Sequence, residues 1–182
     1  MYISPKAALA LTPRAVQQRS SDGKIVILLD QMEKPTARSK CRSIYLRVKL
    51  GNDESSHLYH SSQIRVYGRP GVYGKDSKQY LLHPSSRLWL HCRCPYFLYY
   101  CEQALARIKA TSIYDCRPEL RVKDPRRQRN PNLVPYVCKH LYAALLALMK
   151  AESGKTSYKE FTNPKNPYDG DYDDKMPPSY VR

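Results

Sequence analysis

Alternation of apolar and polar side chains predicts a sheet in the first half of the chain. Along residues 43–50, the apolar side chains at every second position share one face, while Arg47 and Lys49 share the other. Turn residues such as Gly51 end these runs. The pattern predicts four strands, over residues 43–50, 63–67, 78–83 and 87–94.

The last predicted strand carries two cysteines on its apolar face. Because side chains alternate along a strand, Cys92 and Cys94 point to the same side as two leucines, and His91 points to the other. Pro95 lacks the backbone N–H that a strand needs and should end it. Both thiols are therefore expected to face the core together.

Two helices are expected after this strand. Apolar residues recur at helical spacing first at Phe97, Cys101, Ala104, Leu105 and Ile108, and later at Val137, Leu141, Ala144, Leu145 and Leu148. Pro135 lies just ahead of the second helix, where a helix start tolerates proline, and Gly154 is expected to end it.

A C-x-C pair and a C-x-H pair together predict one zinc site. On a strand, residues i and i+2 share a face, so the C-x-C pair can bind one ion. Within a helix the same spacing diverges by roughly 200°, so Cys138 should lie just before the helix and His140 in its first turn. Three thiolates and one imidazole form a closed tetrahedral site, which indicates a structural rather than a catalytic role. The predicted ligands are Cys92, Cys94, Cys138 and His140.

Other cysteines and histidines fit this site less well. Cys116, between the two helices, could replace one ligand, whereas His91 faces away from the thiols. Cys101 falls on the apolar side of its helix and is expected to be a core thiol. Cys41 is expected to play no part, and His60 is assigned to a solvated, Ser-rich loop.

These elements predict an α+β fold: a small antiparallel sheet with two helices, stapled by zinc at a strand–helix junction, with extended arms at both ends. Residues 1–40, with three prolines and scattered basic residues, are expected to form a basic N-terminal arm. The apolar run 25–29 within it is either a short strand docked on the body or part of a disordered leader. Residues 41–150 form the body, and residues 151–182 form an extended tail rich in Pro and Asp.

Composition narrows the class of protein. A chain of 182 residues with 2 Phe and 16 Tyr is expected to form one domain with a modest core. It has no run of 18 apolar residues, and the apolar stretch 7–11 is too short for a signal peptide. We therefore expect no membrane segment and a reducing compartment, in which the 6 cysteines are thiols or metal ligands.

The charge is one-sided. Lys and Arg total 31 against 16 Asp and Glu, a net charge of +15, which favours nucleic acid or an acidic protein surface as partner. A basic, proline-rich segment between the two predicted helices is the candidate contact for phosphate or a partner. Its basic residues are Arg117, Arg121, Lys123, Arg126, Arg127 and Arg129.

The cysteine and histidine pattern resembles the SWIM-type zinc finger, whose signature is C-x-C, a spacer and C-x-H on a strand–strand–helix frame. The resemblance covers about residues 63–150, and its zinc-ligand role falls on the four residues named above. The spacer of 43 residues between Cys94 and Cys138 is longer than usual. The runs C-x-C-P-Y-F and N-P-N-L-V-P-x-x-C-K-H-L also resemble SWIM-like structural proteins of large tailed bacteriophages.

This resemblance implies a non-enzymatic structural protein of a bacteriophage virion, made in the host cytoplasm and held together by one Zn2+. Its implied partners are other structural proteins of a large assembly, contacted through the arms and the basic segment, with no membrane and no small-molecule substrate. A nucleic-acid-binding zinc finger protein, located in the cytoplasm, is the alternative. An enzyme is disfavoured because no phosphate-binding glycine loop, nucleophile elbow or H-E-x-x-H motif occurs.

Overall fold

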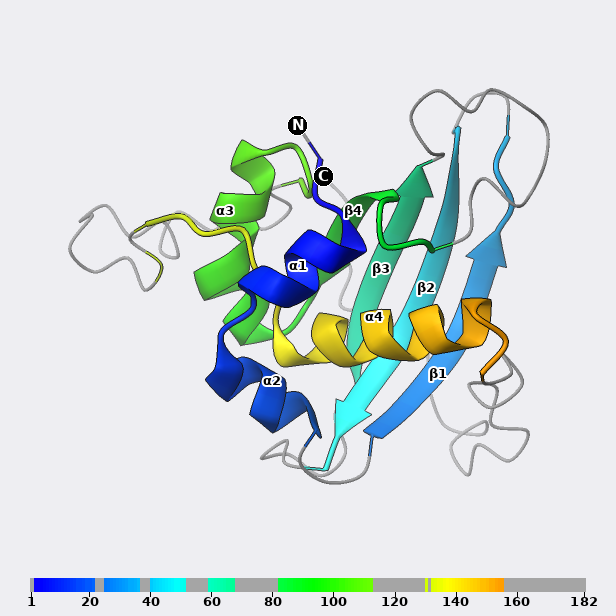
Figure 1. Ribbon diagram of the computed structural model, residues 1–182. Helices are drawn as coiled ribbons and strands as arrows, with labels where there is room; N and C mark the ends of the chain where they lie inside the picture. Colours follow the sequence, from blue (N-terminus) through cyan, green and yellow to red (C-terminus); the bar gives the residue numbers. More distant parts are fainter. Residues whose placement is uncertain are drawn as a thin grey trace, which may run out of the picture.

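Four antiparallel strands form one sheet in the described part of the chain, in the order β1-β2-β3-β4 (Figure 1). The computed structural model describes residues 2–21, 25–36, 40–51, 59–67, 82–112, 130 and 132–155. The strands are β1 Ile25–Glu33, β2 Cys41–Leu50, β3 His60–Tyr67 and β4 Arg87–Cys92. The helical segments are α1 Pro5–Leu11, α2 Arg14–Ser21, the π-helix η2 Phe97–Cys101, α3 Glu102–Arg107 and α4 Lys139–Glu152. The predicted α+β class with an antiparallel sheet is confirmed.

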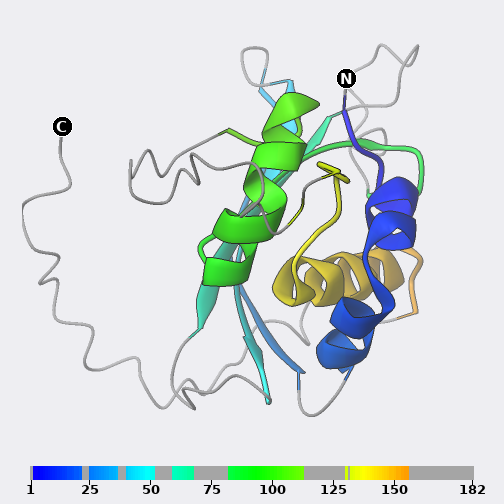
Figure 2. The same ribbon diagram turned by 90° about the vertical axis from the view of Figure 1, so that its left-hand side faces the viewer.

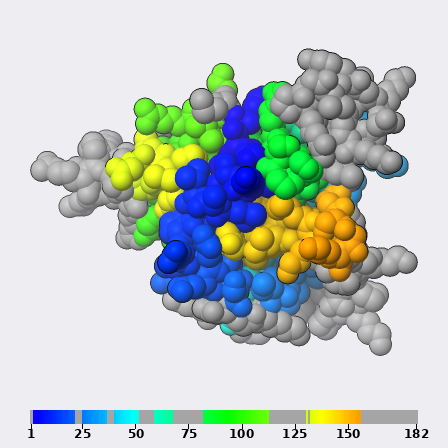
Figure 3. Space-filling view, viewed as in Figure 1, coloured from blue at the N-terminus to red at the C-terminus, as the bar shows by residue number. Residues whose placement is uncertain are grey.

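One face of the sheet is covered by α4, on which α1 and α2 pack in turn (Figures 1 and 2). The space-filling view shows α1 and α2 lying beside α4 at the surface (Figure 3). The apolar side chains that alternation assigns to one side of β2, among them Ile44 and Val48, are fully buried against this layer. Leu141, Leu145 and Leu148 of α4 are equally buried, so sheet and helix share one core.

The N-terminal segment is not an extended arm, which corrects the prediction for residues 5–33. Pro5 and Pro13 counted among the features that predicted an arm over residues 1–40, but Pro5 is the first residue of α1 and Pro13 directly precedes α2. Proline is favoured at such positions because the first N–H groups of a helix have no partner within it. The Ser4 side chain caps α1 by accepting a hydrogen bond from the Ala7 N–H at 3.2 Å. The alternative of a docked strand at 25–29 is confirmed, since β1 pairs with β2.

The free edge of β4 is closed by two loops from outside the sheet. The Leu88 N–H donates to the Ile3 carbonyl at 2.8 Å, and the Leu90 N–H donates to the Ala110 carbonyl at 2.7 Å. Unpaired edge groups invite association with other chains, so these bonds protect the strand that carries Cys92.

The helix predicted after Pro95 is confirmed, although its first part contains a π-helical turn, η2, before α3. The strand predicted at 78–83 lies mostly outside the described residues, and its last two residues, Leu82 and His83, are not in a strand. The tail is described only as far as Lys155. Among the described residues, none of the helices combines the length and apolar character needed to cross a bilayer.

Candidate metal centre

Four potential metal ligands meet where the end of β4 faces the start of α4. Cys92 is the last residue of β4, and Cys94 follows it by two positions. Cys138 is the N-cap of α4, with extended backbone (φ −73°, ψ 167°), and His140 lies in the first turn, as predicted. One ligand atom from each residue lies within 4.8 Å of all the others.

A tight turn places Cys94. Directly after β4 the chain folds into a helix, with the Phe97 and Leu98 N–H groups donating to the Cys94 carbonyl at 3.0 and 3.3 Å. The Phe97 N–H also lies 3.3 Å from the Cys94 Sγ. The contact with Cys138 and this N–H favour the thiolate, which is the form that binds a metal, but the neighbouring Cys92 and burial outweigh them and raise the pKa of Cys94.

Two polar side chains that sequence reasoning missed hold the segment before α4. The Val137 N–H donates to the Thr12 hydroxyl at 3.3 Å, and this hydroxyl donates to the Ala8 carbonyl at 2.7 Å, so α1 supports the approach to Cys138. The Asn130 amide donates to the carbonyls of Tyr100 and Val134 at 2.9 Å each and accepts from the Val134 N–H at 3.1 Å. Asn130 thereby ties this segment to η2.

The cluster is fully inside the protein. The exposed fractions of Cys92, Cys94, Cys138 and His140 are 0, 2, 0 and 1%. Burying several polar groups together is costly unless they are satisfied by one another or by a metal ion. The location therefore favours a permanently held ion over one that exchanges freely with solvent.

The pKa values of the Cys92 and Cys138 thiols are shifted in opposite directions. Burial raises the pKa of Cys92, but hydrogen bonds from Cys138, Cys94 and His140 outweigh it, so the pKa of Cys92 lies well below its usual value. Burial, together with the neighbouring Cys92, raises the pKa of Cys138 well above its usual range. A divalent cation is the partner that would allow all three sulfurs to ionise, since coordination deprotonates a thiol outright.

The donor set fits a tetrahedral ion. With metal–sulfur distances of about 2.3 Å and a metal–nitrogen distance of about 2.0 Å, neighbouring donor atoms lie about 3.5–3.8 Å apart. Four atoms mutually within 4.8 Å are of the right size for such a sphere. The four residues therefore form a buried cluster able to hold a metal ion.

His60 belongs to the surroundings of this cluster, not to a solvated loop, which corrects the prediction. It is the first residue of β3, and its ring centroid lies 4.3 Å from that of His140, with the ring planes at 47°. The sequence carried no signal for this contact, because His60 and His140 are brought together only by the packing of α4 on the sheet.

The other candidates fall elsewhere. Cys101 is buried in η2 and burial raises the pKa of its thiol, as expected for a core cysteine. Cys41 is buried at the start of β2, and neither it nor His91 belongs to the cluster. Cys116 lies outside the described residues, as do the predicted contact residues Arg117, Arg121, Lys123, Arg126, Arg127 and Arg129.

Comparison with known proteins finds no matching family model, no matching curated protein and no matching solved structure.

Proposed function

We propose that this chain is a non-enzymatic structural protein whose fold is held by one zinc ion at Cys92, Cys94, Cys138 and His140. The observation that carries the proposal is the meeting of four buried donor atoms at a strand–helix junction. Structural zinc sites take such sets of thiolates and imidazoles, whereas iron–sulfur clusters usually take four cysteines.

The closed donor set supports a structural role. Catalytic zinc sites have three protein ligands and keep a position for water or substrate, and this cluster offers four ligands. The ligand residues are also at most 2% exposed, so a substrate would have no direct approach to the ion. Zinc would instead join β4 to α4, two elements that are far apart in the sequence.

We further propose that the protein is a component of a bacteriophage virion and contacts other structural proteins. The resemblance of its C-x-C and C-x-H motifs to SWIM-like phage proteins supports this role, and the net charge of +15 suits contact with acidic surfaces. Quantitative mass spectrometry of purified particles tests it. Recovery of the chain only in the free lysate, and never in particles, would contradict it.

Metal analysis of purified protein tests the zinc proposal. We expect one zinc per chain, and Cys94→Ser should lower this ratio strongly because it removes a ligand sulfur. Cys101→Ser is the matched control, since Cys101 is also a buried thiol but lies outside the cluster. Replacement of zinc by Co2+ should give the absorption of a tetrahedral thiolate site in the parent and the control. A chain purified with no metal, or equal loss in both variants, would overturn the proposal.

A further inference from the structure

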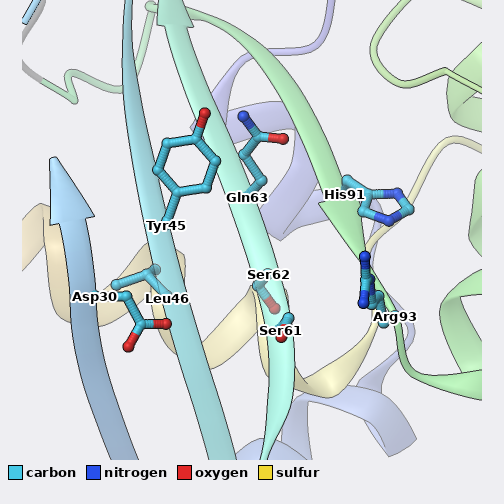
Figure 4. A pocket seen from close by; sticks show the side chains of 8 residues that line it. All are labelled: Asp30, Tyr45, Leu46, Ser61, Ser62, Gln63, His91 and Arg93. Carbon is cyan, nitrogen blue, oxygen red and sulfur yellow. The ribbon is translucent and has the colours of Figure 1, made fainter. Parts of the chain in front are cut away.

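The two faces of the sheet differ in what lies over them. The helices α4, α1 and α2 are on one side, and among the described residues no helix lies across the other (Figures 1 and 2). We call this second side the open face. Figure 4 looks onto it, with α4 behind the strands.

The charges on the open face are strongly segregated. The strands β2, β3 and β4 contain no Asp or Glu. Side-chain alternation puts five cations on the open face, four from these strands and one, Arg93, from the position directly after β4. They are Arg47, Lys49, Arg65, Arg87 and Arg93. The acids lie on β1, where Asp30 accepts a hydrogen bond from Arg47 at 2.7 Å.

Aromatic rings lie among these cations. The Arg65 guanidinium lies 4.4 Å from the centroid of the Trp89 ring, which is buried beneath it and positions the cation. Arg47 and Lys49 each place their charge 5.9 Å from the centroid of Tyr59. A surface that alternates cations with rings can hold phosphates and base planes side by side.

A depression of about 390 Å³ lies in the same face. Tyr45, Gln63 and His91 project into it from three neighbouring strands, with Arg93 at its rim (Figure 4). Tyr45, Gln63 and His91 are partly exposed and Arg93 is exposed. The depression therefore offers a ring, an amide, an imidazole and a cation to one bound group. Asp30 of β1 also lines it, and its carboxylate is paired with Arg47.

We propose that the open face binds single-stranded nucleic acid, with phosphates on its cations and a base in the depression beside Tyr45. The absence of acids from β2–β4 fits a polyanion, and the partly exposed rings of Tyr45 and Tyr59 fit unpaired bases, whose planes a duplex hides. The metal cluster lies on the opposite side of the sheet, and the open-face residues are other residues than those of the basic segment 117–129. The proposal goes beyond the zinc-stabilised structural role and does not depend on it.

Fluorescence anisotropy with a labelled oligothymidylate of about 20 nucleotides tests the proposal on the full, metal-loaded chain. The test variant is Lys49→Ala/Arg93→Ala, which removes two cations from the open face. Each lost phosphate contact should reduce the slope of log Kd against log salt by about 0.7, so the pair should reduce it by about 1.4. We expect Kd to rise about tenfold or more at moderate salt. The matched control is Lys6→Ala/Arg14→Ala, which removes two exposed charges from α1 and α2 and should leave the slope unchanged.

Variants of Tyr45 distinguish the contribution of base stacking to binding from that of charge. Tyr45→Ala should weaken binding by about 5- to 150-fold without changing the salt slope, because stacking on a ring contributes about 1–3 kcal/mol per base. Tyr45→Phe keeps the ring and loses only the hydroxyl, which donates to Glu33 at 3.4 Å, so it should bind like the parent.

Any of four binding results would overturn the proposal. They are no binding of the oligonucleotide, equal loss of affinity in the open-face and control variants, duplex bound as tightly as single strand, or loss of affinity only in Arg126→Ala/Arg127→Ala. Capture of an acidic protein by this face, without oligonucleotide binding, would assign it to a protein partner and would also overturn the proposal. Zinc content measured on the same samples distinguishes a failure of the nucleic-acid proposal from a failure of the zinc proposal. Far-UV circular dichroism shows that each variant has folded.

Discussion

The two ends of α4 are attached to the sheet by different chemistry. At the N-terminal end, Cys138 and His140 meet Cys92 and Cys94 of the β4 end in a cluster that can hold a metal ion. At the C-terminal end, Glu152 forms a buried ion pair with Arg42 of β2. The first attachment can be completed by a metal ion, whereas the second consists only of groups of the chain.

This difference predicts how stability should respond when the attachment at each end of α4 is removed. Metal binding contributes about 10–16 kcal/mol in small zinc modules, as much as the total stability of a domain, about 5–15 kcal/mol. A buried ion pair is different, because the cost of removing two charges from water offsets most of their attraction. We therefore expect the N-terminal attachment to decide whether the chain folds and the C-terminal one to adjust its stability.

The largest expected effect is that of metal removal. Stripping the protein with a chelator should abolish the cooperative thermal transition, since about 10–16 kcal/mol of binding free energy is lost with the ion. Circular dichroism melts before and after stripping, and after adding back one equivalent of zinc, measure this effect. A stripped chain, shown by metal analysis to be free of zinc, that melts at the same temperature would contradict the comparison.

The next effect is at the other end of α4. Glu152→Ala leaves the Arg42 charge buried without its carboxylate, and we expect a loss of about 3–5 kcal/mol in the free energy of unfolding. Both side chains are at most 10% exposed, so solvent cannot take the place of the lost partner. Urea unfolding of the metal-loaded protein measures the loss, and zinc content should remain that of the parent.

Two controls sharpen this prediction. Arg42→Met/Glu152→Leu replaces both charges with apolar groups and should be within about 1 kcal/mol of the parent or more stable. Asp30→Asn breaks an ion pair whose side chains are 35–36% exposed, and should cost at most about 1 kcal/mol. A Glu152→Ala loss as small as that of Asp30→Asn would show that the buried pair does not hold α4.

A smaller effect is expected next to the metal cluster. Thr12→Val keeps the shape of a 2%-exposed side chain but removes the hydroxyl that accepts from the Val137 N–H. A buried N–H without an acceptor costs about 1–3 kcal/mol, which urea unfolding of the zinc-loaded chain can measure. Thr12→Ser retains the hydroxyl and should lose only the packing of one methyl group, about 0.8 kcal/mol. Equal losses in the two variants would assign the role of Thr12 to packing.

The sheet and the cluster could be predicted because their signals are local. Strict alternation identified β2 and β4, although β4 ends at Cys92 and Cys94 lies in the turn after it, outside the predicted strand 87–94. The divergence of residues i and i+2 on a helix correctly placed Cys138 before α4. The N-terminal helices were missed because Pro5 and Pro13 have the same composition signal whether they break a helix or begin one.

Contacts between distant segments could not be predicted. The ring contact of His60 with His140, the hydrogen bond from Val137 to Thr12 and the Arg42–Glu152 pair each join residues at least 80 positions apart. No periodicity within a short window encodes such a pairing, since it depends on how α4 lies across the sheet. The open face was missed for the same reason, because its cations come from three strands that only the sheet brings together.

The end of α4 offers the smallest effect. Gly154 was predicted to end the helix, and its N–H donates to the Ala151 carbonyl at 3.0 Å with φ at +74°. A Cβ at this position would meet nothing within 4 Å, so the cost of Gly154→Ala is purely that of the left-handed backbone, about 1–2 kcal/mol. Gly154→Asn should cost less because Asn tolerates this conformation, and the difference in urea midpoint between the two variants measures the strain. Neither change should affect zinc content, because the metal cluster lies at the opposite end of the helix. A loss of zinc in Gly154→Ala would show that the two ends of α4 are not independent attachments but one coupled unit.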